Sequence, residues 1–353
     1  MTALAQAGFD VVLASEYRSW EGRGDLNRQK LIHNEAEKIA DKLVNMYIQG
    51  PWRPNAWFTY HLHHKAPDWI GPRVCSALAI PYYIAEASIA HKQSGGPWDP
   101  GFQASVRAVN QASGIFTINP ADTEGLAKTR GGGAGILQLT PFLDQPPQSK
   151  QQKQLLRRNI AARMKINPDR YWLLTVAMMR NDSKLDSYQQ LARSIELIQR
   201  KDWCLLVVGD GPGELMVREF FRFDLDRRVY FMGKRDAAFI LEIMSAADLL
   251  VWPAINEAIG MVALEALACG LPAVWGRSGG IEQIVEHRKN GVLVDAPARQ
   301  NAPPHFAEAI ESLLDQPSQL SAMSEAALSS YLAHHQLKTA AAALARVIDP
   351  DRK

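Results

Sequence analysis

Short apolar blocks, separated by stretches of helical periodicity, organise the second half of the chain. The blocks at residues 171–179, 204–208 and 229–232 are each followed by a charged residue or a glycine. A segment with a helical pattern, residues 186–199, lies between the first two blocks. Continuous apolar runs of this length are typical of strands buried on both faces of a sheet. The pattern predicts strands that alternate with helices.

One predicted helix has an unusual composition. Residues 261–269 are apolar at every position except Glu265, and a helix that is apolar on nearly all sides is a buried helix. A buried carboxylate costs roughly several kcal/mol unless hydrogen-bond donors surround it. We therefore expect Glu265 either to meet a cation, for which Arg277 is the candidate, or to bind hydroxyl groups of a ligand.

The start of this helix offers an anion site, because its first backbone N–H groups lack helical partners and lie at the positive end of the helix dipole. These groups belong to Ile259, Gly260, Met261 and Val262. Glu257 lies at the same end of the helix. An anion site flanked by two carboxylates suggests a sugar diphosphate as the ligand.

The segment from Glu257 to Glu265 resembles the Glu-x7-Glu motif of retaining GT-B glycosyltransferases, the large family 4 type. Two glutamates at this spacing occur by chance about once in such a chain, so the surroundings carry the resemblance. It extends from about residue 171 to about residue 323, with its matches in the family's order. The matches are Arg180 and Lys184, Gly209 and Gly211 of a GDGPG loop, Gly233 before Lys234 and Arg235, Ser278 with two glycines, and Asn290 with Gly291.

The resemblance implies roles on the diphosphate side of the site. Arg180 and Lys184 would grip the diphosphate of a nucleotide sugar, and Gly209 and Gly211 would form a turn beneath the nucleotide. The loop at residues 234–235 would contact the nucleobase. Taken singly, the two cations also fit solvated surface charge, and GDGPG also fits an ordinary turn.

The resemblance also implies the reaction. A sugar would pass from a nucleotide diphosphate sugar to an acceptor hydroxyl with retention at the anomeric carbon, without an essential metal or another cofactor. Glu257 would orient hydroxyls of the donor sugar, and Glu265 would hold the ribose hydroxyls. The helix N-terminus and the basic pair would stabilise the departing diphosphate. The family is associated with polysaccharide and glycolipid biosynthesis, so a lipid-linked sugar or a polysaccharide is the expected acceptor.

Two alternatives remain open at this stage. A GT-B sugar-nucleotide epimerase shares the donor site but needs acid and base groups from both domains and no acceptor. An inactive nucleotide-sugar-binding or scaffold protein would bind a nucleotide without turnover.

The implied fold is α/β GT-B, in which two Rossmann-like domains face each other across a cleft. The expected divisions are an acceptor-side domain over residues 1–165, a nucleotide-sugar-binding domain over 166–330, and a C-terminal helix over 331–353 that packs back toward the first domain. The stretch 304–314 and the tail 318–347 are expected to be helical, and 139–144 resembles the last strand of the first domain.

The first half departs from the family pattern. Such a domain opens with a strand, a glycine-rich loop, a helix and a second strand. Here residues 1–7 look like the end of that helix, Gly8 its cap, and 9–14 the second strand. The first strand lies centrally in such a sheet, so we expect the natural start to lie upstream. A degenerate acceptor domain is the alternative.

Candidate acceptor-side residues follow two predicted strands in this half. A strand at 57–62 carries His61 and leads to His63 at its carboxyl end, where parallel sheets place ligands. A strand at 81–85 leads to Glu86 and then His91. Many family members have a histidine where Glu86 stands, close to the reacting sugar. Glu86 is therefore a weaker catalytic candidate. The histidines lack carboxylate or cysteine partners at metal-ligand spacing, so no metal is expected.

The glycine-rich stretch at 131–135 resembles a phosphate loop. It precedes a predicted strand at 136–139 rather than a helix, so we expect a flexible loop in the cleft between the domains.

Composition narrows the class of protein. The chain has 353 residues, of which 47% are hydrophobic and 22% charged, and a formal net charge of +2, which argues against a dedicated nucleic-acid binder. It shows no apolar run of about 18 residues for a membrane span and no secretory signal, so a cytoplasmic location is expected. The three cysteines are expected to be reduced core residues. The basic stretch at 18–30 fits either peripheral contact with an anionic membrane or a solvated face.

Overall fold

The computed structural model describes residues 1–133, 135–147, 152–223, 227–295 and 302–349. The chain divides into two compact units: unit 1 comprises Met1–Thr140 and Ala340–Lys353, and unit 2 comprises Pro141–Thr339. The predicted division after residue 165 therefore differs from the observed one after Thr140. The helix α6 (Lys153–Met164) belongs to unit 2 because its Lys153 and Arg157 bind the carboxylate of Asp248, at 3.0 and 2.9 Å.

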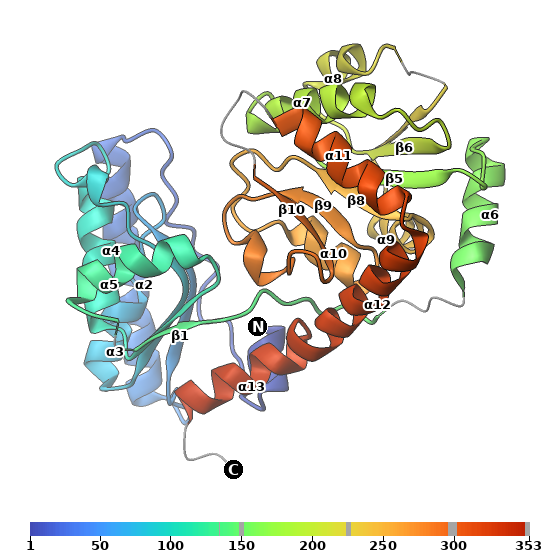
Figure 1. Ribbon diagram of the computed structural model, residues 1–353. Helices are drawn as coiled ribbons and strands as arrows, with labels where there is room; N and C mark the ends of the chain where they lie inside the picture. The colour runs from blue at the N-terminus through green and yellow to red at the C-terminus, as the bar shows by residue number, and fades with distance from the viewer. Residues whose placement is uncertain (134, 148–151, 224–226, 296–301, 350–353) are drawn as a thin grey trace. The chain divides into compact units, whose positions relative to one another are not determined.

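Unit 2 is built on six parallel strands in the order β10-β9-β8-β5-β6-β7 (Figure 1). They are β5 (Tyr171–Val176), β6 (Trp203–Val208), β7 (Val229–Gly233), β8 (Leu249–Trp252), β9 (Ala273–Gly276) and β10 (Gly291–Val294). The chain runs outward from β5 in one direction and then returns to start β8 on its other side. This is the doubly wound order, in which ligands bind beyond the carboxyl ends of the two strands where the order reverses.

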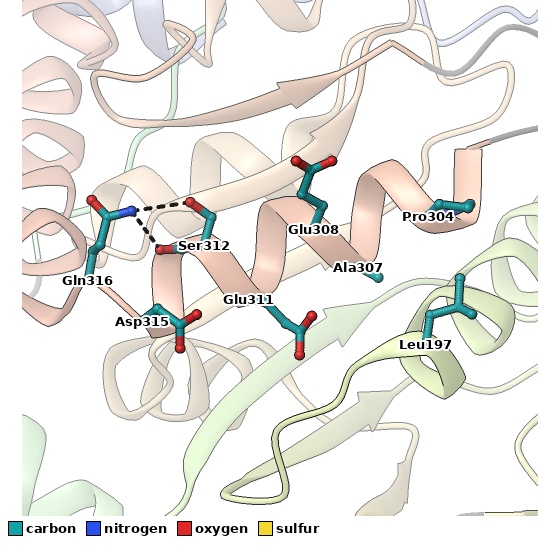
Figure 2. Close-up of a pocket in the computed structure, with 8 residues that line it drawn as sticks. All are labelled: Leu197, Pro304, Ala307, Glu308, Glu311, Ser312, Asp315 and Gln316. Atoms are coloured by element: carbon teal, nitrogen blue, oxygen red, sulfur yellow. Dashed lines mark hydrogen bonds between the residues drawn. The ribbon is translucent and has the colours of Figure 1, made fainter.

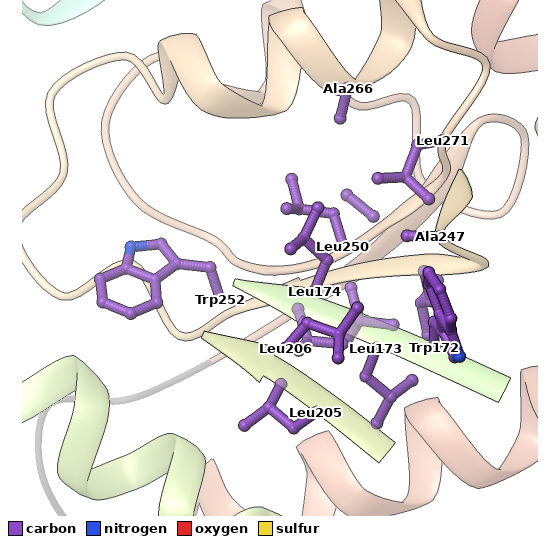
Figure 3. Close-up of a cluster of buried hydrophobic side chains, with 14 of the residues drawn as sticks. Trp172, Leu173, Leu174, Leu205, Leu206, Ala247, Leu250, Trp252, Ala266 and Leu271 are labelled. Carbon is purple, nitrogen blue, oxygen red and sulfur yellow. The ribbon is translucent and has the colours of Figure 1, made fainter. Parts of the chain in front are cut away.

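Helices cover both faces of this sheet. One face carries α7 (Ser183–Leu197), α8 (Glu214–Phe220) and α11 (Ala302–Leu314), and the other carries α9 (Ala237–Ala246), α10 (Met261–Ala268) and α12 (Pro317–His334) (Figure 1). These elements confirm the strands and helices expected from the apolar pattern. The core between the layers includes Trp172, Leu174 and Leu250, which are fully buried (Figure 3).

Unit 1 holds a four-stranded parallel sheet in the order β1-β2-β3-β4. Its strands are β1 (Trp57–His63), β2 (Tyr82–Ser88), β3 (Gly114–Thr117) and β4 (Ile136–Gln138). Its helices are α1 (Thr2–Gln6), α2 (Leu26–Gln49), α3 (Gly71–Leu78), α4 (Asp99–Gln111) and α5 (Pro120–Arg130), with a 3-10 turn η1 (His91–Gln93). The helices α3, α4 and α5 pack on the strands. The predicted strands at 57–62, 81–85 and 136–139 are confirmed.

The predicted strand at 9–14 is wrong. Phe9 to Ala14 form no strand, and Val12 and Leu13 are exposed. A short apolar segment forms a strand only when a neighbouring strand takes its backbone hydrogen bonds. The chain that follows is instead fastened elsewhere, since the Tyr17 hydroxyl donates to Ile32 O at 3.1 Å and Ser19 Oγ donates to Pro67 O at 2.6 Å.

The region around residue 140 also differs from expectation. The predicted strand at 139–144 is reduced to a single bridge between Leu143 and Gln336. The predicted helical tail is divided into two helices at this bridge. Because Leu337 N donates to Leu143 O at 3.1 Å, α12 ends at His334 and α13 (Leu337–Ile348) begins after it. From Ala340 onward α13 belongs to unit 1, where Val347 O and Ile348 O accept from the Tyr83 hydroxyl.

Two further expectations concern side chains and a loop. Cys75, Cys204 and Cys269 are buried free thiols, as predicted. Of the glycine-rich stretch, Gly131 is the left-handed cap of α5, and residue 134 lies outside the described residues. None of the helices in the described parts of the chain is long and apolar enough to cross a membrane.

Candidate functional site

The carboxyl ends of β5 and β8 define a polar region of unit 2. These strands are direct neighbours, with Leu173 opposite Leu249 and Leu174 opposite Leu250. The loops that leave the strands around the reversal are residues 177–184 after β5, 209–213 after β6 and 253–260 after β8. We call these three loops the switch edge. Most of the donor-site residues predicted from the sequence lie in them.

The glycines of the second loop seat it against the first. Gly209 has φ +146° and Gly211 φ +150°, and a Cβ at either position would overlap a carbonyl oxygen of Ala177 or Met179. Backbone hydrogen bonds join the same segments, since Met179 N donates to Asp210 O and Gly213 N donates to Met179 O, both at 2.8 Å. Only glycine allows this close approach, so the loops after β5 and β6 pack directly against each other through their backbones.

The two predicted cations of the switch edge have different surroundings. Arg180 is half exposed, and its Nε lies 3.1 Å from the carboxylate of Asp182, which is equally exposed. Lys184 lies in the first turn of α7, where Asp182 also caps the helix by accepting from Lys184 N at 2.9 Å. The Lys184 ammonium is mostly buried and forms an ion pair with Glu257.

Aromatic rings support this ion pair from within the unit. Lys184 Nζ lies 5.4 Å from the ring centroid of Trp252, and Trp252 packs edge-on against Tyr188 at 4.9 Å. The Tyr188 hydroxyl donates to Ala177 O at 2.8 Å, the carbonyl group that Gly209 contacts. The sequence analysis did not single out Trp252 or Tyr188; their place in an apolar strand and on a buried helix face gives no signal beyond core packing.

The backbone that carries Glu257 is held by the loop after β9. Ser278 Oγ donates to Glu257 O at 3.2 Å, and Gly280 N donates to Ala258 O at 2.8 Å. Gly279 has φ +56°, and a Cβ there would overlap the carbonyl oxygens of Glu257 and Ala258. The serine and two glycines matched in the sequence therefore fix the position of Glu257.

The N-terminus of α10 follows this loop. Its N-cap, Gly260, has φ +86° and no side-chain cap. A Cβ at Gly260 would lie 2.9 Å from Ile281 Cδ1 and 3.3 Å from Trp275 Cζ2. The Trp275 indole N–H is buried and has no partner among the described residues. Ile259 and Val262 are half-buried, and Met261 is exposed, so the first backbone N–H groups of α10 lie at the edge of the core.

Glu265 lies one turn into α10. Burial raises the pKa of its carboxyl group. Arg277, the cation considered for it, instead pairs with Glu282 and with Asp295, the latter at 2.6 Å. Within the described residues Glu265 has no ion-pair partner, so the expectation of a neutralising arginine is not met, and a ligand remains the candidate source of donors.

The predicted nucleobase loop follows β7. Gly233 O accepts from Gly209 N at 3.0 Å, which ties the end of β7 to the glycine turn. Lys234 is exposed, whereas the Arg235 guanidinium lies 4.9 Å from the ring centroid of Phe239. Lys234 is therefore the next residue after a direct contact with the switch edge, and its charged group is exposed to solvent.

In unit 1 the structure brings together His61 and Glu86. Both have left-handed backbone angles, with φ +67° and +54°. They interrupt the pairing of β1 with β2, in which Tyr60 pairs with Ala85 and Leu62 with Ala87. His61 Nδ1 lies 3.5 Å from Glu86 Oε2, and the Tyr60 hydroxyl donates to the same oxygen at 3.2 Å. Non-glycine residues in this conformation are strained and concentrate at functional sites.

The other predicted histidines have separate surroundings. Burial, together with the nearby His61, His64 and Lys65, lowers the pKa of His63 to about 4. Its Nδ1 accepts from Lys65 N at 3.2 Å, so the proton of the neutral ring is on Nε2. His91, in η1, faces α5 instead, with Nε2 3.3 Å from Thr129 Oγ1 and 3.4 Å from Gly125 O.

A separate surface pocket of about 570 Å³ lies along α11 and the end of α7 (Figure 2). It is lined by Leu197, Pro304, Ala307, Glu308, Glu311, Ser312, Asp315 and Gln316. Its polar groups already serve the fold, since Glu311 Oε1 accepts from Gln199 N at 2.6 Å and Gln316 Nε2 donates to Ser312 O at 3.1 Å. The residues predicted for function are not among those that line it.

Comparison with known proteins finds a family that resembles part of unit 2. Residues 170–316 match the family model described as glycosyl transferases group 1. The N-acetyl-alpha-D-glucosaminyl L-malate synthase of Bacillus anthracis is 32% identical over 117 residues, which are 33% of this chain and 30% of that protein. The D-inositol 3-phosphate glycosyltransferase of Thermobispora bispora is 43% identical over 83 residues, 24% of this chain and 18% of that protein. The alignments thus span less than a third of these relatives.

Solved structures agree on the fold. The Anabaena protein HepE in complex with UDP superposes with a TM-score of 0.68 at 18% identity, over 89% of this chain and 82% of that one. A glycosyltransferase from Rickettsia africae superposes with a TM-score of 0.69 at 13% identity, over 93% and 84%. Residues 170–316 are thus similar to group 1 glycosyltransferases, and the chain has the α/β fold with parallel sheets of GT-B proteins.

Proposed function

We propose that this chain transfers a sugar from a nucleotide diphosphate sugar to an acceptor hydroxyl, with retention of the anomeric configuration. The observation that carries the proposal is the switch edge, which holds a mostly buried lysine, a glutamate on a fixed backbone and an open helix N-terminus at the reversal point of a doubly wound sheet. One turn into that helix, Glu265 has no ion-pair partner among the described residues. Each group matches one part of such a donor. The match of residues 170–316 to the family model and the UDP-bound structural neighbour support the same ligand class.

The chemistry follows from these groups. The bond between the anomeric carbon and the diphosphate oxygen breaks, the acceptor oxygen bonds to the same face of that carbon, and the acceptor proton passes to the departing phosphate oxygen. Lys184, Arg180 and the N–H groups of α10 would stabilise the negative charge that grows on the diphosphate. These charges belong to the protein, so the proposed reaction needs no metal ion.

The two glutamates would have distinct tasks. Glu257, held by the loop after β9, would accept hydrogen bonds from hydroxyls of the donor sugar. Glu265 would accept from the ribose hydroxyls, which supply donors to a half-buried carboxylate that has no ion-pair partner among the described residues. Lys234 and Arg235 would contact the base.

On the acceptor side we propose Glu86 and His61 as the polar pair that receives the acceptor hydroxyl. Their strained backbone and shared contact support this role more than the geometry of His63 or His91 does. A lipid-linked sugar or a polysaccharide is the proposed acceptor, and the proposed location is cytoplasmic, with peripheral membrane contact through the basic stretch at 18–30. The names of the relatives add L-malate and D-inositol 3-phosphate to the acceptors worth testing.

The first test is calorimetric titration of UDP, GDP, ADP and their sugars, with the wild type and Glu265→Ala. We expect one nucleotide series to bind the wild type and Glu265→Ala to bind it about tenfold more weakly, because a hydrogen bond to a charged group contributes about 1.5 kcal/mol or more. Ser324→Ala, a substitution on α12 outside the switch edge, is the control and should bind as the wild type does.

Turnover of the binding donor with the acceptor panel then separates the alternatives. Consumption that requires an acceptor supports transfer, and consumption without any acceptor indicates an epimerase or a hydrolase. Binding without consumption would indicate an inactive binding protein. Absence of binding by all three nucleotide series would contradict the proposed function.

A further inference from the structure

The ion pair between Lys184 and Glu257 joins two groups to which the proposed function gives separate tasks. Lys184 should meet the diphosphate and Glu257 the sugar, yet in this structure each is the other's partner. The side chains are 16% and 24% exposed. The neighbouring pair of Arg180 and Asp182 is 51% and 45% exposed, so water screens it far more strongly.

The two partners differ in how far they can move. Glu257 is anchored, because Ser278 and Gly280 bind the carbonyl groups of its segment and Gly279 leaves no space behind it. Lys184 has a flexible four-carbon side chain on the first turn of α7. The backbone of Glu257 is therefore fixed, and the ammonium, on the longer side chain, can move farther than the carboxylate when the pair rearranges.

We propose that Glu257 competes with the diphosphate for Lys184 and thereby makes the site discriminate between the donor and its nucleotide product. This inference rests on the proposed function. An arriving diphosphate must draw the ammonium away from a mostly buried carboxylate, and breaking such a pair is costly when one charge is left unpaired. A donor offsets that cost because its sugar hydroxyls donate to the freed Glu257. The nucleoside diphosphate left after transfer has no sugar to satisfy Glu257, so Glu257 recaptures Lys184 and the product leaves.

The charge balance of the switch edge agrees with this competition. The three loops of the switch edge carry two cations, Arg180 and Lys184, and three carboxylates, those of Asp182, Asp210 and Glu257, so their formal charge without ligand is not positive. A diphosphate gains a strong attraction only when Lys184 turns from Glu257 toward it. Removal of the Glu257 charge makes the site attractive to the bare nucleotide.

The test compares Glu257→Gln with the wild type by calorimetric titration of UDP, GDP and ADP and of the corresponding nucleotide sugars. We expect Glu257→Gln to bind the nucleoside diphosphate about tenfold more tightly than the wild type does, equivalent to about 1.4 kcal/mol. The preference of the wild type for the nucleotide sugar over the bare diphosphate should shrink by a similar factor. A role confined to holding the fold would weaken both ligands together.

Asp182→Asn is the matched control. It removes the carboxylate partner of Arg180 and keeps a residue that can cap α7. Because the Arg180–Asp182 pair is exposed, the diphosphate affinity should change less than threefold. Lys184→Met supplies a second variant. In that background the Glu257→Gln substitution should have no further effect on diphosphate affinity, because the two residues act through one pair.

The outcomes separate this inference from the function on which it rests. Equal or weaker diphosphate binding by Glu257→Gln, with nucleotide sugar bound by the wild type, would overturn the competition and leave the transferase proposal standing. Failure of every nucleotide to bind either protein would contradict the proposed function and this inference with it.

Discussion

Units 1 and 2 both carry polar groups at the carboxyl edge of a parallel sheet, but they build their sites differently. In unit 2 the glycines Gly209 and Gly211 bring two loops of the switch edge together, because a Cβ at either position would overlap a neighbouring carbonyl oxygen. The third loop has left-handed angles at Ala254 and Asn256, φ +55° and +53°, and neither is a candidate functional residue. In unit 1 the left-handed angles at His61 and Glu86 fall on the candidate functional groups themselves, whose side chains contact each other.

The comparison of the two units predicts that the largest loss of stability comes from substitution of Gly209. Gly209→Ala should destabilise unit 2 by about 3 kcal/mol, because it combines a backbone angle that alanine rarely adopts with overlap on the Ala177 carbonyl. Chemical denaturation followed by tryptophan fluorescence measures this loss. Gly233→Ala is the control: it has φ +66° with open space around it, so only about 1 kcal/mol should be lost. Equal losses in the two variants would show that close loop contact is not what requires glycine at 209.

The next effect concerns strain in unit 1. Glu86→Gly should stabilise the protein by about 1 kcal/mol, because glycine adopts the left-handed angle without strain, and should slow sugar transfer. Arg288→Gly is the matched control, since Arg288 is exposed, has φ +63° and lies outside both sites; it should stabilise without slowing transfer. A Glu86→Gly protein that is less stable than the wild type would contradict the view that strain is stored at this pair.

The smallest effect is the pH response of His63. Its pKa is lowered to about 4 in the folded state, so between pH 6.5 and 4 the unfolded chain binds more protons than the folded one. The contribution of His63 to the free energy of unfolding should therefore be fully present above pH 6.5 and decrease as the pH drops toward 4. His63→Gln should reduce this loss of stability in denaturation measured at pH 7 and pH 5, with His305→Gln, at an exposed position of α11, as control. A slope unchanged by His63→Gln would assign the acid sensitivity elsewhere.

The sequence predicted unit 2 far better than unit 1, for physical reasons. Buried parallel strands have continuous apolar runs, and glycines forced by close loop contact mark the turns, so both features are visible without a structure. The 9–14 segment shows the limit of this approach: its apolar run fits a strand, but strand formation depends on a neighbour that lies elsewhere in the chain. The end of α12 is a similar case, because its stop is a hydrogen bond to Leu143 rather than a local signal.

Pairings between side chains were also beyond prediction. Lys184 and Glu257 were each expected in the site, but their contact depends on how the loops after β5 and β8 leave adjacent strands. The supports from Trp252 and Tyr188 lie in ordinary core sequence. The pairing of His61 with Glu86 depends on the register of β1 and β2, which neither strand specifies alone.

Hydrogen–deuterium exchange, with and without the nucleotide sugar that binds most tightly, tests the central claim most directly. The account predicts slower exchange in peptides that cover residues 179–185, 209–213 and 257–265, with no change in residues 304–316 around the α11 pocket. Protection confined to the α11 pocket, or the absence of protection at the switch edge under saturating ligand, would contradict it.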